Sequence, residues 1–100
     1  MMKALKIEKH RIVELDIENT LEALQNAVDG YIETVPIRFI SPDKAVMIVN
    51  EEGRLRKMEI NRTASLYADT LIVGNALVVG VNGEEFTDVP DDIAREISLR

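Results

Sequence analysis

The sequence contains no cysteine and no tryptophan, only one histidine, and no long apolar stretch. Without cysteine, the protein can form no disulfide, no thiolate nucleophile and no cysteine-ligated zinc site. Aromatic residues make up 4% of the chain, so a core has to be built from aliphatic side chains and methionine. No apolar run approaches the ~20 residues of a membrane helix. Because charge appears as early as Lys3, we also expect no signal peptide and predict a cytoplasmic protein.

Negative charge dominates the chain, which has a formal net charge of −6 at pH 7. Non-specific nucleic-acid binding requires lysine and arginine side chains that neutralise phosphates, so this balance disfavours it. The basic residues cluster once, over 54–57, and acids flank that cluster at Glu51, Glu52 and Glu59. We interpret the cluster as a solvated strand or turn, while a local patch for one anionic ligand stays open.

Several stretches have the pattern of β-strands. Apolar residues alternate with acids over 13–17, as in a half-buried strand, and the longest apolar run, 71–79, suits a central strand. Asn82-Gly83 predicts a tight hairpin turn. The Asn-Glu-Glu-Gly turn at 50–53 is predicted to close a second hairpin, with 54–58 as its returning strand. The full set of strand-like stretches is 3–8, 11–16, 31–37, 45–49, 54–58, 71–79 and 84–87.

The predicted main helix, residues 20–28, carries signals at both ends. Asn19 is expected to be its N-cap, with Glu22 three residues later as the capping-box partner. Gly30 is expected to follow the last turn in the left-handed conformation. One apolar stripe should face the sheet, formed by Ile17, Leu21, Leu24 and Val28.

Two shorter helices are predicted further along the chain. Asn61 is expected to cap a helix over 62–68, and Pro90 to open a final helix in which Ile93 and Ile97 face inward. The apolar residues of the first short helix are available for packing: Ala64, Leu66 and Tyr67. Residues 1–100 are therefore predicted to form a single α+β domain, with an antiparallel-rich sheet of five or six strands, one main helix and two short ones.

Four short polar motifs are spaced along this apolar framework. They are Gly30-Tyr31-Ile32-Glu33, Asn50-Glu51-Glu52-Gly53, Asn61-Arg62-Thr63-Ala64 and Ile72-Val73-Gly74-Asn75. In their order and spacing the chain, over roughly 3–97, resembles a domain-of-unknown-function family found mainly in phage, plasmid and conjugative-element proteins and their relatives in Firmicutes and Actinobacteria. The resemblance departs at Asp29, which stands where the first of two glycines is expected. It implies a small accessory protein of a mobile element and brings no activity with it.

Catalytic side chains are scarce. The single histidine, His10, lies between Lys9 and Arg11 in a predicted turn with no visible carboxylate partner, so we interpret it as a surface residue. Paired acids occur at 51–52, 84–85 and 91–92, but adjacent residues do not generally converge on one ion, and Asp91 and Asp92 suit the first turn of a helix. We therefore predict no enzymatic activity, no metal site and no cofactor.

One group of residues is a candidate for binding an anion. Asn61, Arg62 and Thr63, with Ser65 nearby, offer free backbone amides, a guanidinium and two hydroxyls at a predicted helix start. The alternative is that Asn61 is only a cap and that Arg62 is solvated or pairs with Glu59.

Two further residues would complete a nucleotide-like site. Tyr31 could supply a stacking ring and Glu33 a hydrogen-bond acceptor, while the alternative for Tyr31 is a partly buried residue at the start of a strand. A buried cleft that contains Arg62 would favour this ligand-binding function.

Three classes of function remain after these observations. The first is a non-enzymatic accessory protein of a mobile genetic element that binds a host or element-encoded protein through its acidic surface or a sheet edge. The second is a module that binds or sequesters a small nucleotide-like anion, and the third is a hydrolase or other enzyme. Because the 71–79 run is apolar on both faces and a sheet has open edges, we also expect a homodimer.

Overall fold

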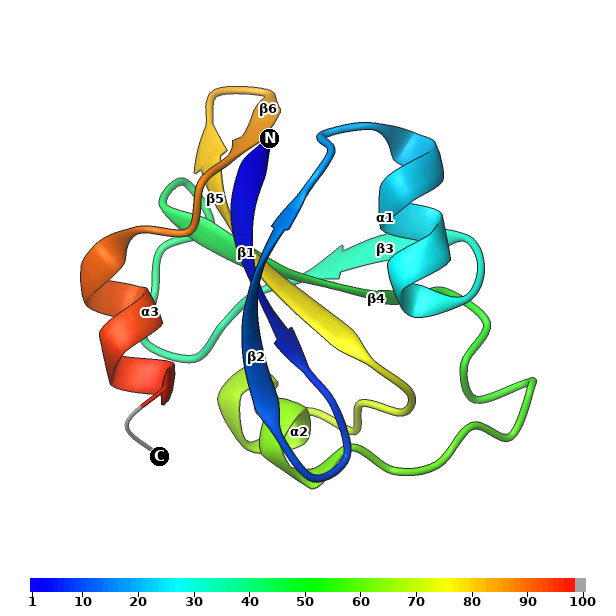
Figure 1. Cartoon of the computed structure of the whole chain (residues 1–100). Coiled ribbons are helices and arrows are strands. Elements are labelled where there is room, and N and C mark those ends of the chain that lie inside the picture. Colours follow the sequence, from blue (N-terminus) through cyan, green and yellow to red (C-terminus); the bar gives the residue numbers. More distant parts are fainter. Residues whose placement is uncertain (99–100) are drawn as a thin grey trace.

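The computed structural model describes residues 1–98, which form one six-stranded antiparallel sheet and three helices (Figure 1). The strands are β1 (Met2–Ile7), β2 (Ile12–Ile17), β3 (Ile32–Val35), β4 (Ala45–Asn50), β5 (Ala76–Asn82) and β6 (Glu85–Thr87). The helices are α1 (Leu21–Val28), α2 (Arg62–Ala68) and α3 (Asp91–Ser98). The predicted α+β class is confirmed, with its antiparallel sheet, its main helix and its two shorter helices.

The sheet is organised around β5. The strand order is β2-β1-β5-β4-β3, and β6 also pairs with β5. Residues 77–80 of β5 pair with β4, whereas 76–78 pair with β1 and 80–82 with β6. The prediction of a central strand is therefore right, although the strand begins at Ala76 and not at 71. It cannot begin earlier because Gly74 has a φ of 74°, outside the extended region.

Helices cover both faces of the sheet. Alternate residues of each strand point to opposite sides, so each strand contributes to both layers of the core. One face packs against α1 through Leu24 and Val28. The other packs against α2 and α3, through Ala64, Ile93 and Ile97 (Figure 1). In β5, Leu77 and Val79 face the α1 side, whereas Ala76 and Val78 face the side of α2 and α3.

The ends of α1 differ from the prediction by one residue. Its N-cap is Thr20, whose hydroxyl accepts a hydrogen bond from the amide of Ala23. The capping box predicted from Asn19 and Glu22 is therefore wrong. Asn19 instead donates a side-chain hydrogen bond to the carbonyl oxygen of Phe86, across the sheet.

At the other end of α1, Asp29 and not Gly30 adopts the left-handed conformation, with a φ of 63°. Aspartate tolerates this conformation better than most residues, so the glycine is not needed there. The predicted apolar stripe is buried at Leu24 and Val28, but Leu21 is 59% exposed.

The predicted hairpin at 50–53 and its returning strand 54–58 are wrong. β4 already has β3 on one edge and β5 on the other, so no edge is left for a further strand. Residues 51–57 form an irregular loop closed by backbone hydrogen bonds, from Arg56 to Glu52 and from Met58 to Gly53. Beyond this loop, Ile60 forms a single bridge with Val73.

The segment after β6 passes close to β5 at Gly80. A Cβ at this position would lie 2.1 Å from the carbonyl oxygen of Asp88. The same segment is tied to β1, since the Lys3 amide donates to Asp88 Oδ1 at 2.8 Å and the Val89 amide donates to the Lys3 carbonyl. Only glycine fits at position 80, and the close approach there holds the start of α3 in place.

Candidate functional site

Asn61, the first residue of the predicted anion site, is buried and fully hydrogen-bonded. Its side-chain nitrogen donates to the carbonyl oxygens of Ile7 (2.8 Å) and Gly74 (2.9 Å), and its side-chain oxygen accepts from the amide of Ala64. The predicted N-cap of α2 is therefore confirmed. Because an asparagine side chain has two donor hydrogens, both engaged here, the Asn61 amide keeps no donor for a ligand.

Ser65, the nearby hydroxyl, is engaged in the same way. It donates to the carbonyl oxygen of Asn61 at 2.7 Å and accepts from the amide of Ile72 at 2.8 Å. These bonds join α2 to the segment that leads into β5. The hydroxyl therefore fixes the position of α2.

The other predicted site residues lie apart from one another. Each lines a different hollow. Tyr31 lines a hollow beside Asp29, and Glu33 lines one beneath the 51–57 loop. Arg62 lines a hollow beside Leu71, and Thr63 lines the main cavity described below. Tyr31 is 64% exposed, so it is not the partly buried residue of the alternative interpretation. Arg62 is exposed and not within a buried cleft.

Three of the four sequence motifs contribute to structural hydrogen bonds. Asn50 is buried; its side-chain nitrogen donates to the Val28 carbonyl at 2.9 Å and its side-chain oxygen accepts from the Glu52 amide, so it fastens the end of α1 to β4. Asn61 connects α2 to β1 in the same way, and its side chain also donates to the Gly74 carbonyl of the fourth motif. The two asparagines therefore support the fold and are not free to bind a ligand.

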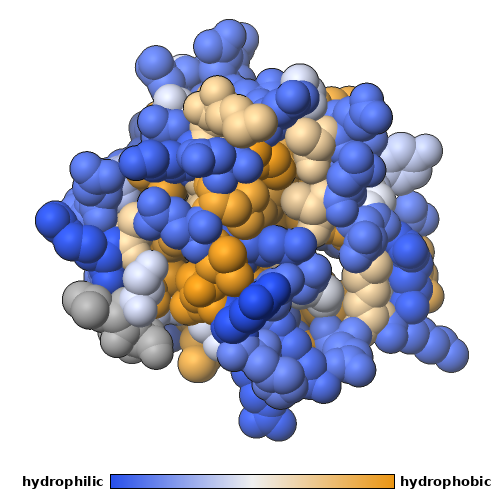
Figure 2. Space-filling model, viewed as in Figure 1, coloured by the Kyte–Doolittle hydropathy of each residue, from blue (hydrophilic) through white to orange (hydrophobic). Residues whose placement is uncertain are grey.

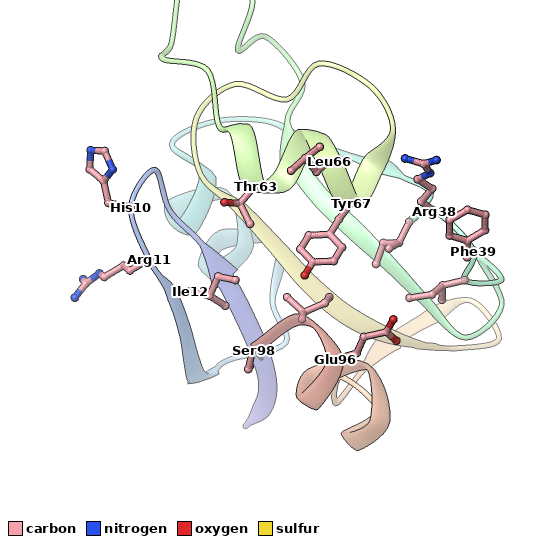
Figure 3. Close-up of a pocket in the computed structure, with 13 residues that line it drawn as sticks. His10, Arg11, Ile12, Arg38, Phe39, Thr63, Leu66, Tyr67, Glu96 and Ser98 are labelled. Carbon is pink, nitrogen blue, oxygen red and sulfur yellow. The ribbon is translucent and has the colours of Figure 1, made fainter. Parts of the chain in front are cut away.

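One hollow, which we call the main cavity, has a volume of about 670 Å³. It lies between the start of β2, the 37–40 turn, α2 and α3 (Figure 3). Its floor is apolar and includes Ile12, Ile37 and Ile97, and the Tyr67 ring points into it from α2. His10 and Arg11 stand at one end, directed away from the centre, and Arg38 and Phe39 stand at the other. Figure 2 shows apolar side chains gathered in the middle of the face that carries β2 and α3, with hydrophilic ones around them.

Exposed apolar side chains surround the outer side of α2. Leu66, predicted to pack inward, is 72% exposed, and Phe39 is 95% exposed. Ile60 and Leu71 share a second hollow with Leu66, while Phe39 shares the main cavity with it, so the four side chains form one continuous surface. We call this surface the α2 face; it consists of Phe39, Ile60, Leu66 and Leu71 with Arg38 and Arg62 beside them.

The 37–40 turn is fixed to α2. The Arg38 amide donates to the Tyr67 carbonyl at 2.7 Å, and Arg38 Nη1 lies 3.7 Å from the carboxylate of Asp69, the C-cap of α2. The Arg38 guanidinium also lies over the Phe39 ring. The sequence analysis did not predict this turn. The available signal was Phe39, an aromatic residue between Pro36 and Pro42, because turn residues are usually polar.

Within residues 1–98, three carboxyl groups have shifted pKa values, and all three shifts are downward. The hydrogen bond from Arg11 lowers the pKa of Glu8, the bond from Lys9 lowers that of Glu59, and the bond from Lys44 lowers that of Asp92. Glu59, the predicted alternative partner of Arg62, thus pairs with Lys9 instead, at 2.5 Å. Such surface ion pairs hold carboxylates ionised, whereas a general acid needs a raised pKa.

Residues 1–98 contain neither a metal-binding cluster nor a membrane-spanning helix. Within this range, no cluster of three or more histidine, cysteine, aspartate or glutamate side chains is placed to hold a metal ion. No helix of the described chain has the length and apolar character needed to span a membrane.

Comparison with known protein families gives one match. A family model described as "Domain of unknown function (DUF3846)" matches residues 2–100. No curated protein and no solved structure matches the chain. The matched span takes in every helix and strand of the described fold.

Proposed function

The chain belongs to the DUF3846 family, a domain of unknown function, and we propose that it is a small, non-enzymatic, cytoplasmic accessory protein of a mobile genetic element. It acts by binding a host or element-encoded protein. The mobile-element part of the proposal rests on the order and spacing of the four sequence motifs. The binding part rests on a single structural observation, the exposed apolar surface of the α2 face.

The α2 face has the composition of a protein-binding surface. Interface centres are enriched in aromatic residues and arginine and depleted of lysine and acids. Phe39 and Arg38 bring these residue types together on exposed positions, with the exposed Leu66 beside them. An apolar side chain in water gains free energy when a partner covers it, by about 25 cal/mol per Å² of buried apolar area.

The remaining chemistry supports a non-enzymatic role. The one histidine, His10, is exposed and points away from the main cavity (Figure 3). The carboxyl groups with shifted pKa values are held ionised by surface cations, as described above. A nucleophile or base would instead have to lie beside an orienting partner within a cavity.

Site-specific photo-cross-linking tests the proposed function. A photoreactive phenylalanine analogue is placed in cells at position 39, at position 66, or at position 21. Leu21 is the matched control, because it is also an exposed leucine but lies on α1, across the sheet from α2. We expect positions 39 and 66 to yield the same protein adduct and position 21 to yield none of it. Once purified, that protein should bind the wild type at least tenfold more tightly than the Phe39→Ser variant.

Equal adducts at all three positions, or none at positions 39 and 66, would refute protein binding at the α2 face. The alternative, a module for a nucleotide-like anion, would use Arg62. Calorimetric titration of the wild type and Arg62→Ala with mono-, di- and cyclic nucleotides tests this alternative, which requires that the wild type binds a nucleotide and that Arg62→Ala does not. Its support is weaker, because Asn61 is consumed by structural hydrogen bonds and Tyr31, Glu33 and Arg62 line separate hollows.

A homodimer is a further candidate assembly. The outer strands of the sheet order are β2 and β3, but β2 exposes Glu14 and Asp16 and β3 exposes Glu33. Pairing of either strand with its own copy would bring like charges together, which is how natural edge strands avoid association. A homodimer would therefore use the α2 face, and light scattering of wild type and Phe39→Ser at high micromolar concentration would detect it.

A further inference from the structure

Phe39 combines two unusual properties. It is almost completely exposed, and its backbone adopts a left-handed conformation with a φ of 65°. This region is unfavourable for a bulky residue and is normally left to glycine, asparagine or aspartate. Strained residues that persist are held by their surroundings and occur preferentially at binding sites.

The surroundings of Phe39 hold it in this position. The turn is closed by the Ile40 amide, which donates to the Ile37 carbonyl at 3.1 Å, while Ile37 itself is buried. On the other side, the Arg38 amide is bonded to the Tyr67 carbonyl of α2. The backbone at Phe39 is thus held while its ring is presented to solvent, so little backbone freedom is lost when a partner covers the ring.

The main cavity next to this ring offers a place for apolar side chains. Its floor contains the buried Ile37 and Ile97 together with Ile12 and the ring of Tyr67. The volume of about 670 Å³ is in the range of small-molecule and peptide-anchor sites. An occupant with bulky apolar side chains would fill it and, in doing so, contact Phe39 and Leu66 at its rim.

The charge around the two hollows differs from that of the whole protein. Among the described residues, their linings include Arg11, Arg38 and Arg62 together with Asp69 and Glu96, whereas the chain has a formal charge of −6. Arg11 pairs with Glu8 and Arg38 with Asp69, but Arg62 forms no ion pair with any residue of 1–98. The Arg62 guanidinium is therefore available to attract an acidic ligand to this surface.

From these contacts we propose that the α2 face and the main cavity bind an acidic segment of the partner protein that carries bulky apolar side chains. The apolar side chains occupy the main cavity and cover Phe39 and Leu66, and the carboxylates face Arg38 and Arg62. This inference rests on the proposed protein-binding function and specifies the chemistry of the partner.

Selection from a displayed library of random peptides tests the inference without knowledge of the partner. The library is selected on the wild type and depleted on the double variant Phe39→Ser/Leu66→Ser, whose two sites are exposed. Thermal melts of the double variant verify that it folds. We expect the enriched peptides to combine aspartate or glutamate with leucine, isoleucine or phenylalanine. For a synthetic peptide of this kind, Arg62→Glu should raise the Kd at least tenfold.

Arg95→Glu is the matched control for that substitution, because Arg95 is an exposed arginine outside both hollows and the change in net charge is the same. It should leave the Kd within about twofold. Enriched peptides that are basic or uncharged, peptides that bind the double variant equally well, or no enrichment at all would each overturn the acidic-segment inference.

These outcomes can be separated from a failure of the proposed function. If position-dependent cross-links form while only basic or uncharged peptides are enriched, protein binding stands and the acidic chemistry is wrong. If no peptide is enriched and the wild type forms dimers that Phe39→Ser dissociates, the occupant is a second copy of the chain. If cross-linking shows no dependence on position, the protein-binding function itself fails.

Discussion

The guanidinium of Arg38 lies 5.0 Å from the centre of the Phe39 ring, within the range of a cation–π contact. The Phe39 side chain is 95% exposed and the Arg38 side chain 47%, so the contact adds little to the core. The turn before β4 is joined to α2 by Arg38 itself, whose backbone amide bonds the Tyr67 carbonyl and whose guanidinium faces Asp69.

The first prediction concerns Phe39→Asn. Asparagine tolerates the left-handed backbone, and the exposed ring buries almost no area in the free protein. We expect the free energy of unfolding to stay within about 0.5 kcal/mol of the wild type or to rise, as measured by chemical denaturation. Phe86→Asn is the matched control and should lose more than about 1 kcal/mol, because Phe86 packs against the α1 side of the core. Equal losses for both variants would show that Phe39 is structural.

The second prediction concerns Asn61. Asn61→Ala leaves the Ile7 carbonyl, the partly buried Gly74 carbonyl and the Ala64 amide without their partner, and a buried group left in this way costs about 1–3 kcal/mol. We expect a loss of at least about 3 kcal/mol in urea denaturation. Arg62→Ala, one residue away but exposed, should change stability by less than about 0.5 kcal/mol.

Asn61→Asp separates the two roles of this side chain. Aspartate keeps the oxygen that accepts from Ala64 but loses both donor hydrogens. If the hydrogen bonds to Ile7 and Gly74 matter most, Asn61→Asp is nearly as unstable as Asn61→Ala. A stability close to that of the wild type would mean that helix capping alone explains the residue.

The third prediction compares two leucines of α1. Leu24 is buried to 3% exposure, so Leu24→Ala should leave a cavity and destabilise the protein by about 2–5 kcal/mol. Leu21 is mostly exposed, and Leu21→Ala should cost less than about 0.5 kcal/mol. Denaturant titration of both variants measures the difference. A change under about 1 kcal/mol for Leu24→Ala would exclude it from the core.

The fourth prediction concerns the pH dependence of the Lys44–Asp92 pair, 2.7 Å long, which joins the segment before β4 to the start of α3. The hydrogen bond from Lys44 lowers the pKa of Asp92 below its ordinary 3.8, with a smaller contribution from the Ile93 amide. A lowered folded-state pKa stabilises the fold above the ordinary pKa, and the contribution is lost as pH falls through the folded value. Glu8 and Glu59 follow the same rule below their ordinary 4.5.

Carbon NMR titration of the Asp92 carboxyl group measures this effect directly. In Lys44→Met the pKa of Asp92 should rise toward the ordinary value, because the hydrogen bond from Lys44 is the largest cause of the lowering. An unchanged titration in Lys44→Met would show that the ion pair does not persist in solution.

The sequence predicted the sheet better than the connections between its strands. Periodicity identified the β5 region as central and the 45–49 run as buried, because alternation and apolar content report burial directly. The 54–58 stretch was misassigned because its partner edge on β4 is taken by β5, whose residues come much later in the chain. Local pattern contains no information about that competition.

The α2 face could not be predicted for a related reason. Leu66 and Ala64 lie on the same short helix, and only the docking of that helix decides that Ala64 is buried while Leu66 faces water. Helix caps, in contrast, depend on local sequence, and Asn61 was recognised as an N-cap from the sequence alone. The long-range bonds to Ile7 and Gly74, which consume its amide, were not visible in the sequence.

The position of β5 in the chain has a consequence for the order of events during synthesis. β1 and β2 form one antiparallel pair and β3 and β4 another, and the two pairs are joined only by β5. A ribosome that adds about 5–20 residues per second needs several seconds to pass from β1 to β5. During that time, the inner edges of β1 and β4 stay open, so a stalled chain is a natural substrate for chaperones until residues 76–82 emerge.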